Sequence, residues 1–263
     1  MIATLALLGA LVAQDAAAIE RQVAAAPDGE VRLTFAARPG VVGNGYGIIG
    51  WDCTDWGRCS HQRMDDGNDA ARADWRALTE PGPVRVSLRV RERTVVGLRT
   101  YVGGAWRPAE RVTDLGRVPA AAAARYFLAL ARRDGGRPAR DAIFAAALAD
   151  SIRIWPDLLA MARNRDIRTD TRKQAVFWLG QAAEDAATAS LDSLADASDE
   201  DVEVREAAVF ALSQRPRDEG IPALIRIARS HRDARLRRRA MFWLAQSDDS
   251  RAIELFEEIL TRK

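Results

Sequence analysis

The sequence contains few of the side chains that most often carry chemistry. Among 263 residues there are two cysteines and two histidines, and lysine occurs only at Lys173 and Lys263. Scarce histidine and cysteine leave few ligands for a metal ion and few nucleophiles for covalent catalysis. The motifs HExxH, GxSxG and GxxxxGK[ST] are also absent. We therefore expect no catalytic residue, cofactor or bound metal, although carboxylates that meet only in the folded chain could form a hydrolytic site.

A large excess of one charge is also lacking. Arg and Lys number 39 against 37 Asp and Glu, which gives a net charge of +2. Proteins that bind nucleic acids usually carry a concentrated basic surface, so the overall charge predicts no nucleic-acid partner. Apolar residues make up 48% and charged residues 29% of the chain, a balance typical of folded domains.

Long hydrophobic runs are absent except at the N-terminus. Residues 1–13, MIATLALLGALVA, are uncharged and mostly apolar, but a membrane-spanning helix needs about 20 such residues. Small residues follow the run, as in secretory signal peptides. We predict a signal peptide over residues 1–15 and an exported protein of the periplasm or cell envelope, without a transmembrane span in the mature chain. A membrane anchor and a buried first helix are the alternatives.

The two cysteines lie close together in WDCTDWGRCSHQ. Cys53 and Cys59 form an even pair that closes a short loop, an arrangement that an oxidising compartment permits. We predict a disulfide between them. A zinc site that uses these thiolates with His61 is one alternative, and free thiols are another. An enzyme or metal-binding site in the segment 53–61 is therefore an alternative to an interaction protein.

Residues 16–118 show the two-residue period of β-strands. Apolar residues alternate with Arg32 in VRLTF and with Arg85 in VRVSLRV. The alternation predicts a small, β-rich N-terminal domain whose antiparallel strands have one solvated face. Residues 83–102 are expected to form a hairpin.

From residue 119 the apolar period changes from 2 to 3.6, which is typical of helices. The octapeptide QAVFWLGQ, which ends at Gln181, returns as AAVFALSQ ending at Gln214 and as RAMFWLAQ ending at Gln246. The intervals are 33 and 32 residues, and a fixed period in this range indicates stacked supersecondary units. We predict a mostly α fold, in which residues 119–263 form an α-α superhelix of about four helix pairs and a final helix.

Two of these repeats resemble HEAT repeats. In DVEVREAAVFAL, Asp201, Arg205 and the apolar positions after them match the second helix of this family, particularly the short bacterial type also found in phycobilisome lyases. The next repeat keeps the pattern at Asp233 and Arg237. The resemblance implies that these Asp and Arg residues hold successive repeats together and that the second helices line a concave surface. It implies no particular chemistry, because function depends on the site and not on the fold.

Some recurring positions do not belong to the core face of the second helix. At 100° per residue, Ala208, Ala211 and Leu212 share the buried face, whereas Phe210 and Gln214 fall on a flank. We predict that this flank binds a protein or peptide partner on the concave face, through Phe177, Gln181, Phe210, Gln214, Phe242 and Gln246. The alternative is that each Phe packs against the second helix of the adjacent repeat.

Charge is segregated within the repeats. Residues 184–206 hold nine acidic residues and one Arg, and a basic patch follows at Arg226, Arg229, Arg232, Arg235 and Arg238. Attraction between neighbouring repeats would explain this segregation. Binding of an anionic partner, such as an acidic peptide, an anionic lipid or a nucleic acid, is the alternative. The main prediction is a non-catalytic interaction or scaffold module of the cell envelope.

Overall fold

The computed structural model describes residues 16–51, 61–63, 79–133, 135–182 and 185–261. The predicted signal peptide and both cysteines, Cys53 and Cys59, lie outside these residues. The chain divides into two compact units, Met1–Ile154 and Trp155–Lys263, and each is described by itself. Within the described residues, no helix combines the length and the hydropathy needed to cross a bilayer.

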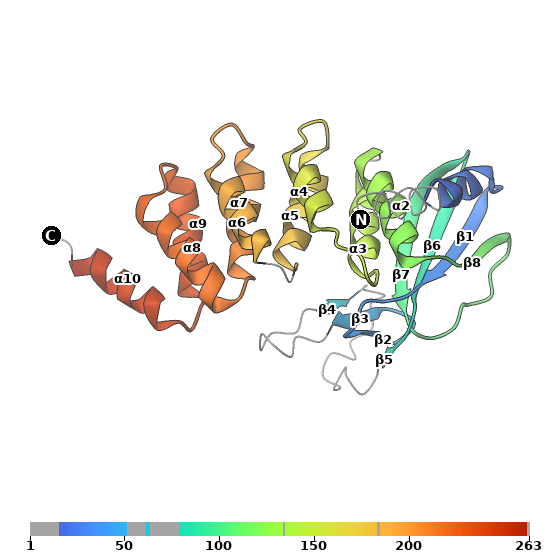
Figure 1. Ribbon diagram of the computed structural model, residues 1–263, viewed down its shortest axis with the longest axis horizontal. Helices are drawn as coiled ribbons and strands as arrows, with labels where there is room; N and C mark the ends of the chain where they lie inside the picture. Colours follow the sequence, from blue (N-terminus) through green and yellow to red (C-terminus); the bar gives the residue numbers. More distant parts are fainter. Residues whose placement is uncertain (1–15, 52–60, 64–78, 134, 183–184, 262–263) are drawn as a thin grey trace, which may run out of the picture. The chain divides into compact units, whose positions relative to one another are not determined.

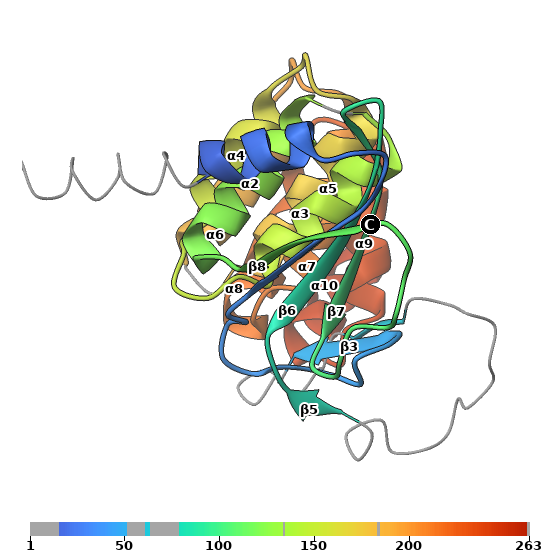
Figure 2. The same ribbon diagram turned by 90° about the vertical axis from the view of Figure 1, so that its right-hand side faces the viewer.

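The first unit contains two four-stranded sheets. The larger sheet has the order β7-β6-β1-β8, formed by β7 (Thr94–Val102), β6 (Val84–Arg91), β1 (Gly29–Phe35) and β8 (Val112–Arg117). Its pairs are antiparallel except for β1 with β8, and the hairpin of β6 and β7 is clear in Figure 2. The smaller sheet has the order β4-β3-β2-β5, formed by β4 (His61–Arg63), β3 (Ile48–Trp51), β2 (Val41–Gly43) and β5 (Glu80–Pro81).

The core of the first unit lies between the larger sheet and two helices. Val31, Leu33 and Phe35 alternate along β1 and are completely buried, as the two-residue period predicts. The Phe35 ring lies 6.0 Å from that of Phe127, which belongs to α2 (Ala120–Arg133). Helix α3 (Arg137–Ala147) packs on α2 and on β7. Residues 16–25 form a further helix, which is tied to α2 by an ion pair between Glu20 and Arg133.

The second unit is a succession of helices (Figure 1). Its elements are α4 (Trp155–Arg163), α5 (Thr169–Gly180), α6 (Ala186–Asp196), α7 (Val202–Ser213), α8 (Arg217–Ser230), α9 (Ala234–Ala245) and α10 (Ser250–Thr261). The first helices α4, α6 and α8 contact one another in order, and so do the second helices α5, α7 and α9. Each helix lies where the 3.6-residue period predicts it.

The boundary between the compact units lies further along the chain than the change in sequence period. The period changes at residue 119, whereas the first unit extends to Ile154 and includes α2 and α3. These two helices cover the sheet, which has a face of apolar residues to bury. The helix pairs of the second unit therefore begin with α4 and α5.

The repeated octapeptide rebuilds one core face in each pair. Ala175 and Leu179 of α5 are completely buried, and Trp178 is 3% exposed. Glycine at position 180 is explained by a close helix contact. A Cβ atom at this position would lie 2.9 Å from the Cβ of Ala211 on α7. Glycine therefore permits the close approach of α5 and α7.

Candidate functional site

Aromatic side chains form a continuous row across the second helices. The Phe177 ring on α5 stacks on that of Phe210 on α7, with 6.3 Å between centroids and 14° between planes. Phe210 also lies 4.9 Å from Trp243 on α9, and Trp243 lies 4.9 Å from Phe242. We call Phe177, Phe210, Trp243 and Phe242 the aromatic row, and the surface formed by α5, α7 and α9 the second-helix face.

The predicted site residues differ in how far they reach solvent. Phe177 and Phe210 are half-buried because their rings pack between successive helices, which is the contact expected from the packing alternative. Phe242 is 50% exposed. The aromatic row thus joins the repeats over most of its length and opens to solvent at α9.

The recurring glutamines stand at the ends of the second helices. Gln181, Gln214 and Gln246 are the C-terminal caps of α5, α7 and α9, where their backbone N–H groups donate to carbonyl oxygens of the last turn. The first two are partly exposed and Gln246 is exposed. All three side chains reach solvent at the ends of the second helices, and that of Gln214 donates from Nε2 to Ser213 Oγ at 3.0 Å.

Arginines of the second helices bind carboxylates that precede the next second helix. Arg172 is 2% exposed at its side chain, and its Nη1 lies 2.9 Å from Asp201 Oδ2. The same guanidinium pairs with the buried carboxylate of Glu200. One repeat later, Arg205 Nη2 lies 3.1 Å from Asp233 Oδ2. These contacts have the connecting role that the HEAT resemblance implies.

Asp233 also caps α9. Its Oδ1 accepts a hydrogen bond from the backbone N–H of Arg235 at 2.9 Å. This bond and the positive charge of Arg205 lower the pKa of the Asp233 carboxyl below its ordinary value. The carboxylate therefore stays ionised and holds both the start of α9 and the guanidinium of the preceding repeat.

The predicted basic patch divides between two surfaces. Three of its arginines bridge to neighbouring first helices or loops: Arg226 pairs with Asp192 and Asp196, Arg229 Nη2 lies 2.5 Å from Glu258 Oε2, and Arg232 Nη2 donates to the Asp196 carbonyl at 3.2 Å. The other two, Arg235 and Arg238, are exposed on α9. Their guanidinium groups have no ion pair within the described part of the chain.

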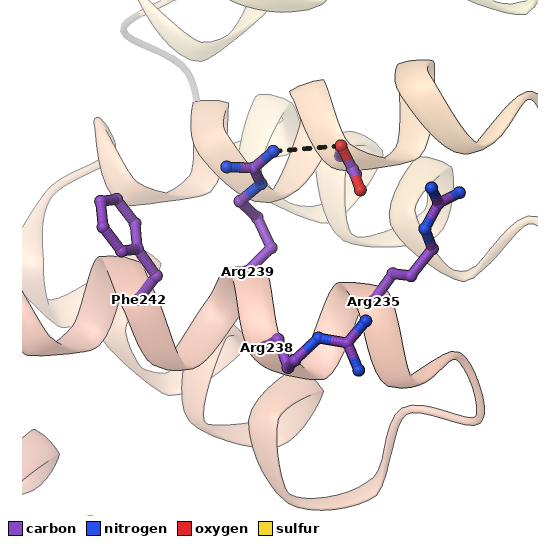
Figure 3. Close-up of a pocket in the computed structure, with 5 residues that line it drawn as sticks. Arg235, Arg238, Arg239 and Phe242 are labelled. Atoms are coloured by element: carbon purple, nitrogen blue, oxygen red, sulfur yellow. Dashed lines mark hydrogen bonds and ion pairs between the residues drawn. The ribbon is translucent and has the colours of Figure 1, made fainter.

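Arg235 and Arg238 line a hollow beside the exposed end of the aromatic row. The remaining lining residues are Glu206, Arg239 and Phe242 (Figure 3). Arg239 Nη2 lies 3.2 Å from Glu206 Oε2, which neutralises one of the three arginines. The hollow thus combines an exposed aromatic ring with two cations that lack a counterion among the described residues. This combination can bind a partner that offers both apolar and anionic groups.

A cluster in the first unit was not expected from the sequence. Arg32 and Arg85 are 9% and 4% exposed, although the strand alternation predicted a solvated face at both positions. Trp106 covers them, because its ring centroid lies 4.8 Å from Cζ of Arg32 and 4.9 Å from Cζ of Arg85. Arg85 Nε also donates to the carbonyl of Gly103 at 2.8 Å. The prediction of a solvated face is therefore wrong at this end of the sheet.

His231 makes contacts that hold its own loop and link it to the preceding repeat. His231 is buried, and its Nδ1 accepts a hydrogen bond from the backbone N–H of Asp233 at 3.0 Å. His231 Nε2 lies 3.4 Å from Asp196 Oδ1, which gives this side chain a structural role between repeats. His61 belongs to β4. Within the described ranges, no three His, Cys, Asp or Glu side chains gather as metal ligands do.

Comparison with known proteins identifies the helical repeats. A family model for HEAT repeats matches residues 155–240 and, in a second match, residues 191–263. The matched residues begin at the first residue of α4. The predicted fold class is confirmed: a helical region of HEAT repeats follows a small region of mainly antiparallel strands. No curated protein matches the chain.

Proposed function

We propose that this protein is a non-catalytic interaction module that binds a protein or peptide partner on the second-helix face of its HEAT repeats. One observation supports the proposal above the others. The aromatic row ends at Phe242, which is 50% exposed beside Arg235 and Arg238. HEAT repeats generally mediate protein–protein interaction, and this role agrees with such a surface.

The residue types on this face suit a protein interface. Aromatic residues and Arg are enriched in the buried centre of interfaces, where a few such residues carry most of the binding free energy. Phe242 and the guanidinium of Arg238 would supply such anchors. Gln214 and Gln246 would form the polar rim that surrounds the anchors and excludes water.

We place the proposed partner binding in the cell envelope on the basis of the sequence. The apolar N-terminal run and the pair Cys53 and Cys59 favour export and an oxidising compartment. The mature protein would carry the short bacterial type of HEAT repeat behind its β-rich N-terminal unit. In this proposal the β-rich unit acts as a cap or as a second contact surface, and the helical repeats bind the partner.

Site-specific photo-crosslinking in the native organism tests the proposal. A photoreactive amino acid at Gln214 or Gln246 is expected to give one adduct of defined mass, because both side chains border the proposed interface. The same amino acid at Ala189, an exposed position on the first helix α6, is the control and is expected to give no such adduct. Equal adducts from Ala189, or none from the two glutamine positions, would contradict the proposal.

A further inference from the structure

The second helices carry three series of side chains that pair from one helix to the next. Each series runs through α5 and α7 and reaches α9. The part of the chain that the structure describes contains no second helix beyond α9, since α10 occupies the place of a first helix and contacts α8 and α9. We define the α9 edge by Arg237, Arg238 and Phe242, the last members of the three series.

The first series consists of the Arg that lies nine residues before each recurring glutamine. Arg172 binds Asp201 at 2.9 Å, and Arg205 binds Asp233 at 3.1 Å. Each of these carboxylates immediately precedes the following second helix. Arg237 is the third member, and its Nη1 donates to two carbonyl oxygens of its own preceding loop, those of His231 and Arg232. Among the described residues, Arg237 therefore has no counterpart of the carboxylate that both earlier members bind.

The second series consists of the charged residue that lies eight residues before each recurring glutamine. Lys173 Nζ lies 3.3 Å from Glu203 Oε2 in the first turn of the next second helix. Glu206 pairs with Arg239 at 3.2 Å, but here the acidic residue is on the earlier helix and the Arg lies in the second turn of α9. Arg238 is the third member, and it is exposed without a carboxylate among the described residues. A partner that continued this series would place an acidic group against Arg238.

The third series is the aromatic row. Phe177 is covered by Phe210 of the next helix, and Phe210 is covered in turn by Trp243. Phe242 is the third phenylalanine at this position, and half of its surface remains exposed. Helix α10, which contacts α9, adds the exposed side chains of Ile253 (59%) and Leu260 (84%) to the apolar surface of this last part of the unit.

We infer that the α9 edge binds a helix of a partner protein that has an acidic first turn and an aromatic residue about two turns later. A carboxylate at the start of that helix meets Arg237, and a second one in its first turn meets Arg238. The aromatic residue packs on Phe242. The inference rests on the proposed function, because it names the class of partner that the end of the second-helix face accepts.

Charge and spacing select this occupant over others. Helix α7 has the same set of groups, with Asp201 before its first turn, Glu203 in that turn and Phe210 further along, and it packs on α5 through all three. A basic helix would place its cations against Arg235 and Arg238, which repel like charges. The partner helix is therefore expected to resemble α7 and to differ from α9.

Two peptides from this chain serve as the probe and its control. The first, residues 200–214, contains the sequence of α7; the second, residues 233–247, contains the basic sequence of α9. Each is labelled with a fluorophore, and its anisotropy is titrated with the full chain. Because an isolated helix of this length is marginal in water and must be ordered on binding, we expect a Kd of roughly 100 μM for the first peptide. The second is expected to bind about tenfold more weakly or less.

A charge-swap pair tests the contact at Arg238. Arg238→Glu in the protein is expected to weaken binding of the first peptide about fivefold, and Glu203→Lys in the peptide is expected to restore it. Arg125→Glu is the matched control, since Arg125 is exposed on α2 in the other unit. The control is expected to leave the Kd unchanged within about twofold.

Several results would overturn the inference. These are equal affinity for both peptides, no saturable binding of either, and an Arg238→Glu variant that binds the first peptide as tightly as the unchanged protein. Self-association of the protein that Arg238→Glu abolishes would assign the α9 edge to a second copy instead. If crosslinks persist at Gln214 while the peptide fails to bind, the proposed function survives and only the partner class is wrong.

Discussion

Arg172 offers a quantitative test of how the helical repeats are held together. Its side chain is 2% exposed and pairs with Glu200, whose side chain is 6% exposed. Arg172 Nε also donates to the carbonyl of Ala162 at 2.9 Å, so one guanidinium joins α4, α5 and the start of α7. Replacement of Arg172 by alanine removes these bonds and leaves the Glu200 carboxylate buried without its cation.

The expected loss follows from the burial of this pair. Removal of one partner of a buried ion pair typically costs about 3–5 kcal/mol, because the remaining charge cannot return to water. Asp201 contributes little to the loss, since its side chain is 53% exposed and can be solvated. We therefore expect Arg172→Ala to lower the free energy of unfolding by about 3–4 kcal/mol and the Tm by roughly 15 °C or more.

Circular dichroism during urea and thermal unfolding measures both quantities, and two further variants separate the causes. Arg205→Ala is expected to lower the free energy of unfolding by about 1–2 kcal/mol. The loss is smaller because the Asp233 side chain is already 23% exposed to water and still accepts the capping bond from the Arg235 N–H. The double variant Arg172→Met with Glu200→Gln is expected to recover much of the loss, since no buried charge remains. A loss below about 1 kcal/mol for Arg172→Ala, or a double variant as unstable as the single one, would refute the reasoning.

Three other predictions concern helix contact, pH and the cysteine loop. Gly180→Ala is expected to reduce the free energy of unfolding by about 1–3 kcal/mol, because the new Cβ would lie 2.9 Å from that of Ala211; urea unfolding checks this, and an unchanged midpoint would show that α5 and α7 have room to separate. The lowered pKa of Asp233, caused first by the Arg235 backbone N–H, predicts stability that is present above the ordinary pKa of 3.8 and is lost as pH falls through the folded value. Asp233→Asn should therefore reduce the slope of Tm against pH below 3.8, and an unaltered slope would contradict this assignment. Mass spectrometry of the purified mature protein is expected to find a Cys53–Cys59 disulfide without stoichiometric zinc, whereas reduced thiols with one bound zinc per chain would favour the metal-site alternative.

The helical repeats could be predicted because their signals are local. The period of 33 and 32 residues and the core positions around Leu179 and Leu212 define each second helix without knowledge of its neighbours. The structure ends α5 at Gly180 and caps it with Gln181, so the end of the repeated octapeptide marks the end of the helix. The apolar period does not indicate which helices will pack on a sheet. Helices α2 and α3 belong to the same compact unit as the strands and are not the first pair of the helical unit.

The candidate site was only partly predictable, because its character depends on contacts between distant residues. Spacing in the sequence joins Arg226 and Arg235 in one patch, but α8 directs the first toward Asp192, whereas α9 presents the second to solvent. Strand alternation likewise places Arg85 on a polar face and does not reveal that Trp106 covers it. A search for acidic residues about one repeat before or after each Arg could have identified the paired arginines, since Asp233 follows Arg205 by 28 residues and Asp192 precedes Arg226 by 34.

The central claim is that the second-helix face binds a protein partner, and Phe242 allows binding to be separated from folding. Its side chain is 50% exposed, so Phe242→Ser is expected to change the free energy of unfolding by less than about 1 kcal/mol. The decisive measurement is the affinity of this variant for the partner captured by crosslinking at Gln246. The account predicts a Kd at least about tenfold weaker than that of the unchanged protein, at nearly the same Tm. An unchanged Kd would contradict it.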